Sequence, residues 1–349
     1  MRVLLAMSGG VDSSVAGALL LEQGHSVVGV TMRLWGGESD TGCCSVSDVD
    51  DARRVAQQLG IDHHVFNFGD EFMAKVVDPY VDGHARGVTP NPCIECNRHL
   101  KFDELLARAD VLGFDAVATG HHARIVRHEG QWAVARGADR DKDQSYVVHM
   151  LDQAAMARTM FPVGEFSKSE VRALAGRLGL RTAAKPDSQD VCFITSEGGR
   201  RAFLGDRIPF RPGTVRTSAG DVVGTVDAVE MVTIGQRRGL ALAGAPSRRF
   251  VLDVDVARAE VTVGAADELL RTHETIVDTV WASSPVDGEV LVQCSAHGAV
   301  HPASASSDGS VLRIDWATPQ RRIAPGQSAV LYSGDDRRVL GGGRVARTA

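Results

Sequence analysis

The 349-residue chain lacks the features that would place it in a membrane or outside the cell. No apolar run approaches the roughly 18 residues that a membrane-spanning helix needs. The N-terminus has neither the charged lead-in nor the long apolar region of a secretory signal. Six cysteines are too few for a disulfide framework in a chain of this length. These absences predict a cytoplasmic protein with no membrane partner, whose cysteines are catalytic, metal-binding or buried.

The chain also has no excess of positive charge. Its formal net charge of -6 argues against a protein that coats nucleic acid nonspecifically. Arginine doublets are nevertheless concentrated in the later part, which contains Arg200-Arg201, Arg237-Arg238, Arg248-Arg249, Arg321-Arg322 and Arg337-Arg338. Each doublet is either a solvated turn or a local basic patch that binds phosphate.

The N-terminal stretch gives the first indication of chemistry. Residues 3–7 form a short apolar run, typical of a strand buried on both faces of a parallel sheet, and residues 15–21 have helical spacing. Two glycines in the intervening loop, Ser8-Gly9-Gly10-Val11-Asp12-Ser13-Ser14, allow successive N–H groups to point into one concavity at a helix N-terminus. The loop is not a Walker A sequence, because no Gly-Lys-Ser/Thr follows. It indicates a phosphate site; the alternative is an ordinary turn in which Asp12 or Ser13 caps the helix.

Hydrophobic periodicity predicts a doubly wound parallel α/β domain followed by two small all-β domains. Strands and helices are expected to alternate in the first part, with strands near 2–7, 26–33, 63–68 and 115–119 and helices over 47–59 and from a Ser-x-x-Glu capping box at Ser167. After residue 205, short β-rich runs replace helical periodicity. We place the three domains at 1–204, 205–272 and 273–349. Since ligands of such sheets lie beyond the carboxyl ends of the strands, the Ser8 loop, Met32 and Gly120 are expected to share one crevice.

The cysteines occur in unusual surroundings. Two prolines, at 90 and 92, precede the pair Cys93 and Cys96 and predict that this Cys-x-x-Cys lies in a loop just before a helix. A helix start with arginine and lysine nearby favours the thiolate of Cys96. Cys192 is flanked by Val191 and Phe193, so from the residues alone it is either a reactive thiol or a small buried hydrophobe.

The motifs together resemble those of the bacterial tRNA-specific 2-thiouridylases, which belong to the N-type ATP pyrophosphatases, and the resemblance covers essentially the whole chain. It implies an adenine nucleotide hydrolase-like fold for the first domain. The matching segments are residues 8–14, 91–97, 101–102, 118–121, 142–146, 185–188, 192–194, 233–240, 325–332 and 340–343.

The resemblance implies an enzyme that uses ATP to adenylate C2 of the wobble uridine in tRNA and replaces its oxygen by sulfur, releasing AMP and pyrophosphate. It assigns ATP to Ala6, Met7, Ser8, Gly9, Gly10, Val11, Asp12, Ser13, Met32 and Gly120, and tRNA to Asn91, Pro92, Lys142, Asp143 and Gln144. Magnesium is expected to accompany ATP, contacted by Asp12 through water. Cys192 is the implied persulfide carrier and Cys96 its catalytic partner, which either releases hydrosulfide or closes a disulfide.

The implied partners are tRNAs with a wobble uridine and a sulfur donor such as a cysteine desulfurase or a persulfide relay protein. The chain departs from the family where many relatives have aspartate in place of Cys93, and where Val226, Val232 and the stretch 293–295 replace expected tRNA contacts. Cys93 therefore leaves open an iron–sulfur cluster on Cys93, Cys96 and Cys192. A zinc site that also uses Cys43 and Cys44 is less compatible with the usual ligand spacing.

Two other functions share part of this pattern. An ATP pyrophosphatase that adenylates a carboxylate, such as a ligase or amidotransferase, would use the Ser8 loop but neither Cys96 nor Cys192. A non-enzymatic tRNA-binding protein would bind tRNA without releasing pyrophosphate.

Overall fold

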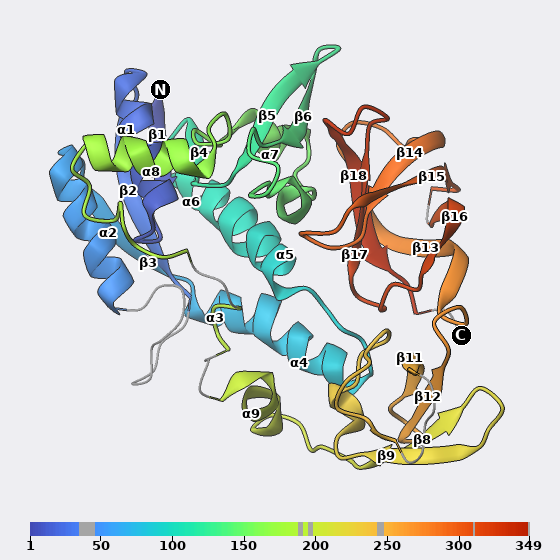
Figure 1. Ribbon diagram of the computed structural model, residues 1–349. Coiled ribbons are helices and arrows are strands. Elements are labelled where there is room, and N and C mark those ends of the chain that lie inside the picture. The colour runs from blue at the N-terminus through green and yellow to red at the C-terminus, as the bar shows by residue number, and fades with distance from the viewer. Residues whose placement is uncertain (35–45, 188–190, 195–197, 243–247, 310, 348–349) are drawn as a thin grey trace.

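A computed structural model describes residues 1–34, 46–187, 191–194, 198–242, 248–309 and 311–347. Figure 1 shows a parallel-sheet domain coloured blue to green, a small sheet in yellow and orange, and a barrel in orange and red. The predicted order of one α/β domain and two β domains is confirmed. The predicted limits of the three domains stay predictions; β13, the first strand of the barrel, is Leu270–Trp281. Within the described ranges, no helix combines the length and apolarity needed to cross a bilayer.

The first domain is built on a five-stranded parallel sheet in the order β3-β2-β1-β4-β7. The strands are β1 (Arg2–Ala6), β2 (Ser26–Arg33), β3 (His63–Asn67), β4 (Ala116–Ala118) and β7 (Thr159–Met160). The first four agree with the predicted strands. The fifth has only two residues and was not predicted, and neither was the hairpin of β5 (Ala123–His128) and β6 (Gln131–Arg136).

Strand β1 explains why both faces of this sheet are covered. Val3 and Leu5 pack in one hydrophobic cluster with α1 (Val11–Glu22), α2 (Val46–Leu59) and α8 (Lys168–Arg177). Leu4 and Ala6 belong to a second cluster on the opposite face. Because side chains alternate along a strand, the unbroken apolar run at 3–7 supplies both clusters. Helices α2 and α8 confirm the two predicted helices, and α8 has the full Ser167 capping box.

The helices of the second cluster follow β3 in the chain. They are α3 (Gly69–Phe72), η1 (Met73–Val77), α4 (Asp78–Ala85), α5 (Pro92–Cys96), η2 (Asn97–Glu104) and α6 (Leu105–Val111). The prediction that Cys93 and Cys96 lie in a loop is wrong, because both belong to α5. The prolines act differently from our expectation: Pro92 occupies the first helical turn, where a missing N–H costs nothing, and the Asn91 side chain caps the helix by accepting from the Cys93 and Ile94 N–H groups.

Four further short elements lie between β6 and β10 in the chain. These are η3 (Ser145–Val148), α7 (Gln153–Ala157), α9 (Gly199–Gly205) and η4 (Val229–Met231). The small sheet has the order β10-β9-β8-β12-β11, formed by β8 (Gly213–Thr217), β9 (Val222–Val226), β10 (Ala241–Leu242), β11 (Phe250–Asp255) and β12 (Glu260–Gly264). Valines dominate its core.

The C-terminal domain is a closed barrel in the order β13-β16-β15-β14-β17-β18. Its remaining strands are β14 (Gly288–Gln293), β15 (Val300–Ser307), β16 (Leu312–Arg321), β17 (Ser328–Tyr332) and β18 (Val339–Val345). Closure removes the unpaired strand edges. The barrel lies against the first domain: Val330, Tyr332 and Val339 belong to the hydrophobic cluster of the helices that follow β3.

Candidate functional site

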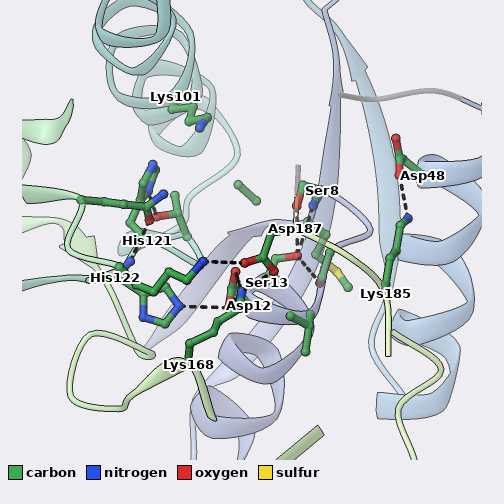
Figure 2. Close-up of a pocket in the computed structure, with 18 of the residues that line it drawn as sticks. Ser8, Asp12, Ser13, Asp48, Lys101, His121, His122, Lys168, Lys185 and Asp187 are labelled. Carbon is green, nitrogen blue, oxygen red and sulfur yellow. Dashed lines mark hydrogen bonds and ion pairs between the residues drawn. The ribbon is translucent and has the colours of Figure 1, made fainter. Parts of the chain in front are cut away.

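A cavity of about 630 Å³ opens where β1, β2 and β4 end, and we call it the first cavity (Figure 2). This is the edge of the sheet at which parallel folds bind ligands. Nine of the ten residues assigned to ATP line it: Ala6, Met7, Ser8, Gly10, Val11, Asp12, Ser13, Met32 and Gly120. The tenth, Gly9, lies in the same loop.

Two glycines shape this cavity because no side chain fits at their positions. Gly9 has a φ of +70°, and a Cβ there would lie 2.4 Å from the carbonyl oxygen of Asp48. At Gly120 a Cβ would lie 2.6 Å from the backbone nitrogen of Ser13. The first glycine lets the loop pass close to α2, and the second lets the end of β4 approach the start of α1.

The N-terminus of α1 has backbone donors available for an anion. Gly10 is the N-cap residue, and no side chain caps the helix there. The alternative prediction, that the side chain of Asp12 or Ser13 caps the helix, is therefore wrong. The Ser13 and Ser14 hydroxyls instead donate to the Gly10 carbonyl oxygen, at 3.1 and 2.8 Å. Uncapped N–H groups and the positive end of the helix dipole make this a phosphate-binding geometry.

Asp12 is held by two basic side chains at the floor of the cavity (Figure 2). Lys168 Nζ donates to both of its carboxylate oxygens at 2.8 and 2.7 Å, and His122 Nε2 lies 3.0 Å from Oδ1. Burial alone would raise the pKa of Asp12, but the hydrogen bonds with His122 and Lys168 outweigh it and lower the pKa below its ordinary value. Asp12 is thus a carboxylate at neutral pH.

Asp187 is a second point at which cations converge. Lys142 Nζ, Lys168 Nζ and Arg172 Nη2 lie 3.1, 2.9 and 2.7 Å from its carboxylate. Burial again opposes ionisation, but hydrogen bonds from Lys168 and Lys142 lower the pKa of Asp187 to about 2. Lys168 therefore connects the loop after β1 to the segment that precedes Cys192.

The other lysines of the cavity complete an unusual charge distribution. Lys185 pairs with Asp48 and Asp51 at the start of α2, at 2.7 and 2.8 Å. Within the described part of the chain, no carboxylate pairs with Lys101. Four of the five lysines of the sequence line the cavity, and no arginine does so among the described residues. This arrangement suits a polyanion that enters and leaves.

His121 adds a neutral polar group to the wall. Its Nδ1 atom lies 2.6 Å from the Thr119 hydroxyl, and its ring contacts those of Phe102 and Phe161 at centroid distances of 6.0 and 5.5 Å. Burial, together with the nearby charge of Lys101, keeps the pKa of His121 well below its ordinary value. The imidazole is therefore uncharged and serves as a hydrogen-bonding group.

The sequence analysis assigned no ATP-binding role to Lys101, Lys168, Lys185 or Asp187. Lys101 entered it as a cation near Cys96, and residues 101–102 and 185–188 only as segments that match the family. Lys168 was noticed only as part of a capping box. The rarity of lysine was the available signal, because only five of the 38 basic residues are lysines and a lysine ammonium is a compact charge on a flexible side chain.

The two cysteines assigned to sulfur chemistry lie at one hydrophobic cluster, outside the set of residues that line the first cavity. Cys96 is a buried member of this cluster, and Cys192 packs against it half-buried. Phe193 fixes the Cys192 segment, because its ring contacts those of Phe72, Tyr80 and Phe203 at centroid distances of 5.6, 5.6 and 5.0 Å. Both cysteines are therefore attached to the same packed unit.

Cys93 is exposed on the same helix as Cys96. Among the described residues, no three His, Cys, Asp or Glu side chains form a metal-binding group, and this includes Cys93, Cys96 and Cys192. The donor arrangement does not fit a cluster, so we derive no step through one. The zinc alternative involves Cys43 and Cys44, which lie outside the described residues.

The residues assigned to tRNA separate into three environments. Lys142 and Gln144 line the first cavity, and Gln144 is tied to His122 by two hydrogen bonds of 2.9 Å. Asn91 and Pro92 form the start of α5. Asp143 is 8% exposed and faces the barrel instead.

Asp143 is part of a buried polar group that we call the domain joint: Arg136, Asp143, Gln293, Tyr332 and Asp336. Arg136 donates to Asp143 at 2.8 Å, to Gln293 at 2.6 Å and to Asp336 at 2.7 Å. Its guanidinium carbon lies 3.5 Å from the centroid of the Tyr332 ring. The first two residues belong to the parallel-sheet domain and the other three to the barrel, so the joint fixes the two domains to each other.

Comparison with known proteins gives matches along the whole chain. Family models match residues 1–196 (tRNA methyl transferase HUP domain), 201–265 (tRNA methyl transferase PRC-barrel domain) and 271–345 (aminomethyltransferase beta-barrel domain). The tRNA-specific 2-thiouridylase MnmA of Roseiflexus sp. (strain RS-1) is 44% identical over 377 residues, which cover 99% of each chain. The protein of the same name from Chloroflexus aurantiacus is 45% identical over 358 residues, covering 99% of this chain and 98% of its own.

Similarity to solved structures is much weaker. The U34-tRNA thiolase NcsA of Methanococcus maripaludis aligns with 59% of this chain and 63% of its own, at 17% identity and a TM-score of 0.37. That similarity is too low to carry an argument about the site.

Proposed function

The chain belongs to the tRNA-specific 2-thiouridylase family, and on that premise we propose that it converts the wobble uridine of tRNA into 2-thiouridine with ATP as co-substrate. The observation that carries the proposal is the first cavity, where an uncapped helix N-terminus and four lysines surround space for a nucleotide. AMP and pyrophosphate are the other products.

The first step activates a poor leaving group. The C2 oxygen of the uridine attacks the α-phosphorus of ATP, and pyrophosphate leaves with the electron pair of the broken P–O bond. N–H groups at the start of α1 and the ammonium of Lys168 are placed to stabilise the charge that develops on the phosphates. Magnesium, bound with ATP, would share this charge, and the ionised Asp12 is the carboxylate that fits it.

Sulfur transfer follows on the adenylated base. The terminal sulfur of a Cys192 persulfide forms a bond to C2, and AMP departs with the former uridine oxygen. The Cys96 thiolate then attacks Sγ of Cys192, so that the S–S bond to the transferred sulfur breaks and its electron pair stays with the base. A Cys96–Cys192 disulfide results, which a thiol reductant must reduce before the next turnover. In the other route, Cys96 first frees hydrosulfide from the persulfide and hydrosulfide attacks C2.

Both routes require the two thiols to come within disulfide range, with Cα atoms roughly 4.4–6.8 Å apart. Support comes from the packing of Cys96 and Cys192 on one hydrophobic cluster. The base must leave the anticodon stack to reach this region, as it does in other enzymes that modify a base.

The test is a reconstituted reaction with ATP, magnesium, unthiolated tRNA and a persulfide donor. Nuclease digestion and mass spectrometry should detect 2-thiouridine with the wild type and none with Cys96→Ser or Cys192→Ser. Cys294→Ser is the matched control, because Cys294 packs against the barrel core and should leave product formation unchanged. Pyrophosphate release that requires a carboxylate instead of tRNA would support the ligase alternative, and tRNA binding without pyrophosphate would support a binding protein.

A further inference from the structure

Three cysteines of the first domain lie at one hydrophobic cluster or on a helix that belongs to it, and the proposed reaction uses only two of them. Cys96 is a buried member of the cluster, Cys192 packs against it half-buried, and Cys93 is exposed. The exposed thiol takes no part in the steps described above. Its position relative to the other two thiols indicates what it can do.

Cys93 and Cys96 share the short helix α5. They are three residues apart, which places their side chains at neighbouring positions of the helix surface, with Cβ atoms about 5–6 Å apart. A disulfide needs Cβ atoms about 3.5–4.5 Å apart, so a small adjustment of one turn brings the two sulfur atoms together. Cys-x-x-Cys is also the spacing found in disulfide oxidoreductases. The helix thus carries a pair of thiols of which one is buried and the other faces solvent.

Tyr80 connects Cys93 with the segment of Cys192. Burial raises the pKa of Tyr80, the charge of Arg200 opposes this rise, and a thiolate at Cys93 adds to it, so Cys93 lies within electrostatic range of the phenol. The Tyr80 ring contacts that of Phe193, the residue after Cys192, at a centroid distance of 5.6 Å. All three thiols therefore belong to the surroundings of one aromatic side chain.

Access limits the reduction of a Cys96–Cys192 disulfide. Both routes of the proposed function end with this disulfide, because the thiolate of Cys96 displaces the transferred sulfur from Cys192 and takes its place. An external dithiol has to approach one of the two sulfur atoms before the next turnover, and Cys96 is only 8% exposed. Rates of thiol–disulfide exchange depend on such access. Cys93, on the same helix as Cys96, is the accessible thiol.

We propose that Cys93 is a resolving thiol, which moves the disulfide from the buried cysteines to the surface of the protein. The proposal rests on the proposed function, because that reaction produces the Cys96–Cys192 disulfide. The Cys93 thiolate attacks Sγ of Cys96, the S–S bond to Cys192 breaks, and its electron pair leaves with Cys192 as a thiolate that can accept the next sulfur. A Cys93–Cys96 disulfide remains.

Reduction then takes place at the exposed sulfur atom. One thiolate of a protein dithiol attacks Sγ of Cys93, and Cys96 departs as a thiolate. The second thiol of the reductant closes the reductant's own disulfide and releases Cys93 as a thiolate. The reductant is oxidised, Cys93 and Cys96 are reduced, and the reductant does not have to enter the hydrophobic cluster.

The first test maps the disulfide that one turnover leaves. Persulfide-loaded protein reacts with ATP, magnesium and unthiolated tRNA without a reductant, remaining thiols are blocked with N-ethylmaleimide, and tryptic peptides are analysed by mass spectrometry. Trypsin leaves Cys93 and Cys96 together in the peptide 87–98, whereas a Cys96–Cys192 disulfide links two peptides. Wild-type protein should give the internal disulfide, and Cys93→Ser the linked peptides. Linked peptides from the wild type, with Cys93 blocked, would overturn the proposal.

The second test measures repeated turnover. With thioredoxin as the reductant, Cys93→Ser should form 2-thiouridine about tenfold more slowly than the wild type in the steady state. An excess of dithiothreitol, a small dithiol that reaches half-buried sulfur atoms, should bring the variant back within about twofold of the wild type. Cys294→Ser, the matched control in the barrel, should equal the wild type with either reductant. A wild-type rate of Cys93→Ser with thioredoxin, or a loss that dithiothreitol does not restore, contradicts the inference.

A third measurement separates this inference from the proposed function. Wild-type protein without tRNA or ATP is equilibrated with reduced and oxidised glutathione, and its disulfides are mapped in the same way. A Cys93–Cys96 disulfide supports the resolving thiol even where the wild type makes no 2-thiouridine, in which case the proposed function alone fails. A Cys96–Cys192 disulfide at equilibrium, or glutathione retained on Cys93, shows that Cys93 does not resolve it.

Discussion

The first cavity and the domain joint both gather charged side chains, but they use different cations. Lysines line the first cavity, and three of them, Lys142, Lys168 and Lys185, pair with carboxylates. These carboxylates remain partly accessible: Asp12 and Asp187 are 28% and 26% exposed. The joint has one arginine, Arg136, which is 5% exposed and makes several short contacts at once. An ammonium is a point charge that exchanges partners, whereas the planar guanidinium fixes several acceptors together.

This difference implies that the two groups of ion pairs have separate functions. If the proposed function is right, the phosphates of ATP would compete with Asp12 and Asp187 for the same lysine ammonium groups, and ligand binding would change these ion pairs. In the joint, the stacked Tyr332 ring and the hydrogen-bonded carboxylates leave Arg136 one arrangement. We therefore expect substitutions in the joint to lower the free energy of unfolding, and substitutions in the first cavity to lower the rate of pyrophosphate release.

The largest effect on stability is expected for Arg136→Ala. Removal of the guanidinium leaves the Asp143 carboxylate buried without its cation, which costs about 3–5 kcal/mol of unfolding free energy. Arg136→Lys should recover only part of this loss, because an ammonium cannot reach all the acceptors. Urea denaturation, followed by the fluorescence of the barrel and of the parallel-sheet domain, would measure the free energy of unfolding of both variants.

Arg313→Ala is the control for that measurement. Arg313 pairs with Asp315 at 2.7 Å, but their side chains are 51% and 47% exposed. Such a pair contributes about 0–1 kcal/mol. If Arg136→Ala and Arg313→Ala shifted the urea midpoint equally, the conclusion that the joint fixes the two domains to each other would be wrong.

The largest effect on activity without a comparable loss of stability is expected for Lys168→Ala. Its ammonium is the group that contacts both Asp12 and Asp187. In the proposed function it would also meet the phosphates of ATP. Its loss should slow tRNA-dependent pyrophosphate release by about 100-fold or more. The folded state should change little, because His122 still contacts Asp12, and Lys142 and Arg172 still contact Asp187.

Lys75→Ala provides the matched control, since Lys75 is the one lysine of the sequence outside the lining of the first cavity and pairs with Glu104. It should release pyrophosphate at the wild-type rate. Equal losses of activity in the two variants would show that lysine position in this domain does not matter.

Local sequence patterns made much of the first domain predictable. The apolar run at 3–7, the helical stripe of 47–59 and the Ser167 capping box depend on residues close in sequence, and each element forms as predicted. The position of the Ser8 loop follows from the general rule for parallel sheets. The strand β7 escaped prediction because two residues carry no periodicity.

The joint was not predictable, because its partners are distant in sequence. Arg136 and Asp336 of the joint are separated by 200 residues, and in the first cavity Lys168 and Asp12 are separated by 156. No periodicity identifies such pairs. The position of Asp143 was unpredictable for the same reason. Asp143 lies in the segment 142–144, which resembles a tRNA contact, but its side chain faces the barrel whereas its two neighbours line the first cavity. The Cys-x-x-Cys helix was missed for a local reason, since Pro92 was read as a helix breaker and acts as a first-turn residue.

The smallest effect is a pH dependence that should distinguish the cavity from the exposed surface. The pKa of Asp187 is about 2 in the folded protein, because hydrogen bonds from Lys168 and Lys142 outweigh the opposing effect of burial. A lowered pKa means that the unfolded chain binds the proton first, so the stabilisation is present above the ordinary value of 3.8 and is lost as the pH falls toward 2. The stability difference between wild type and Asp187→Asn, on the order of 1 kcal/mol, should therefore shrink from about pH 5 to about pH 2.5. Asp315→Asn, at the exposed pair with Arg313, is the control and should show a smaller change in this stability difference over the same pH range. If the stability difference for Asp187→Asn stayed constant with pH, the lysines would not hold the Asp187 carboxylate in its charged form.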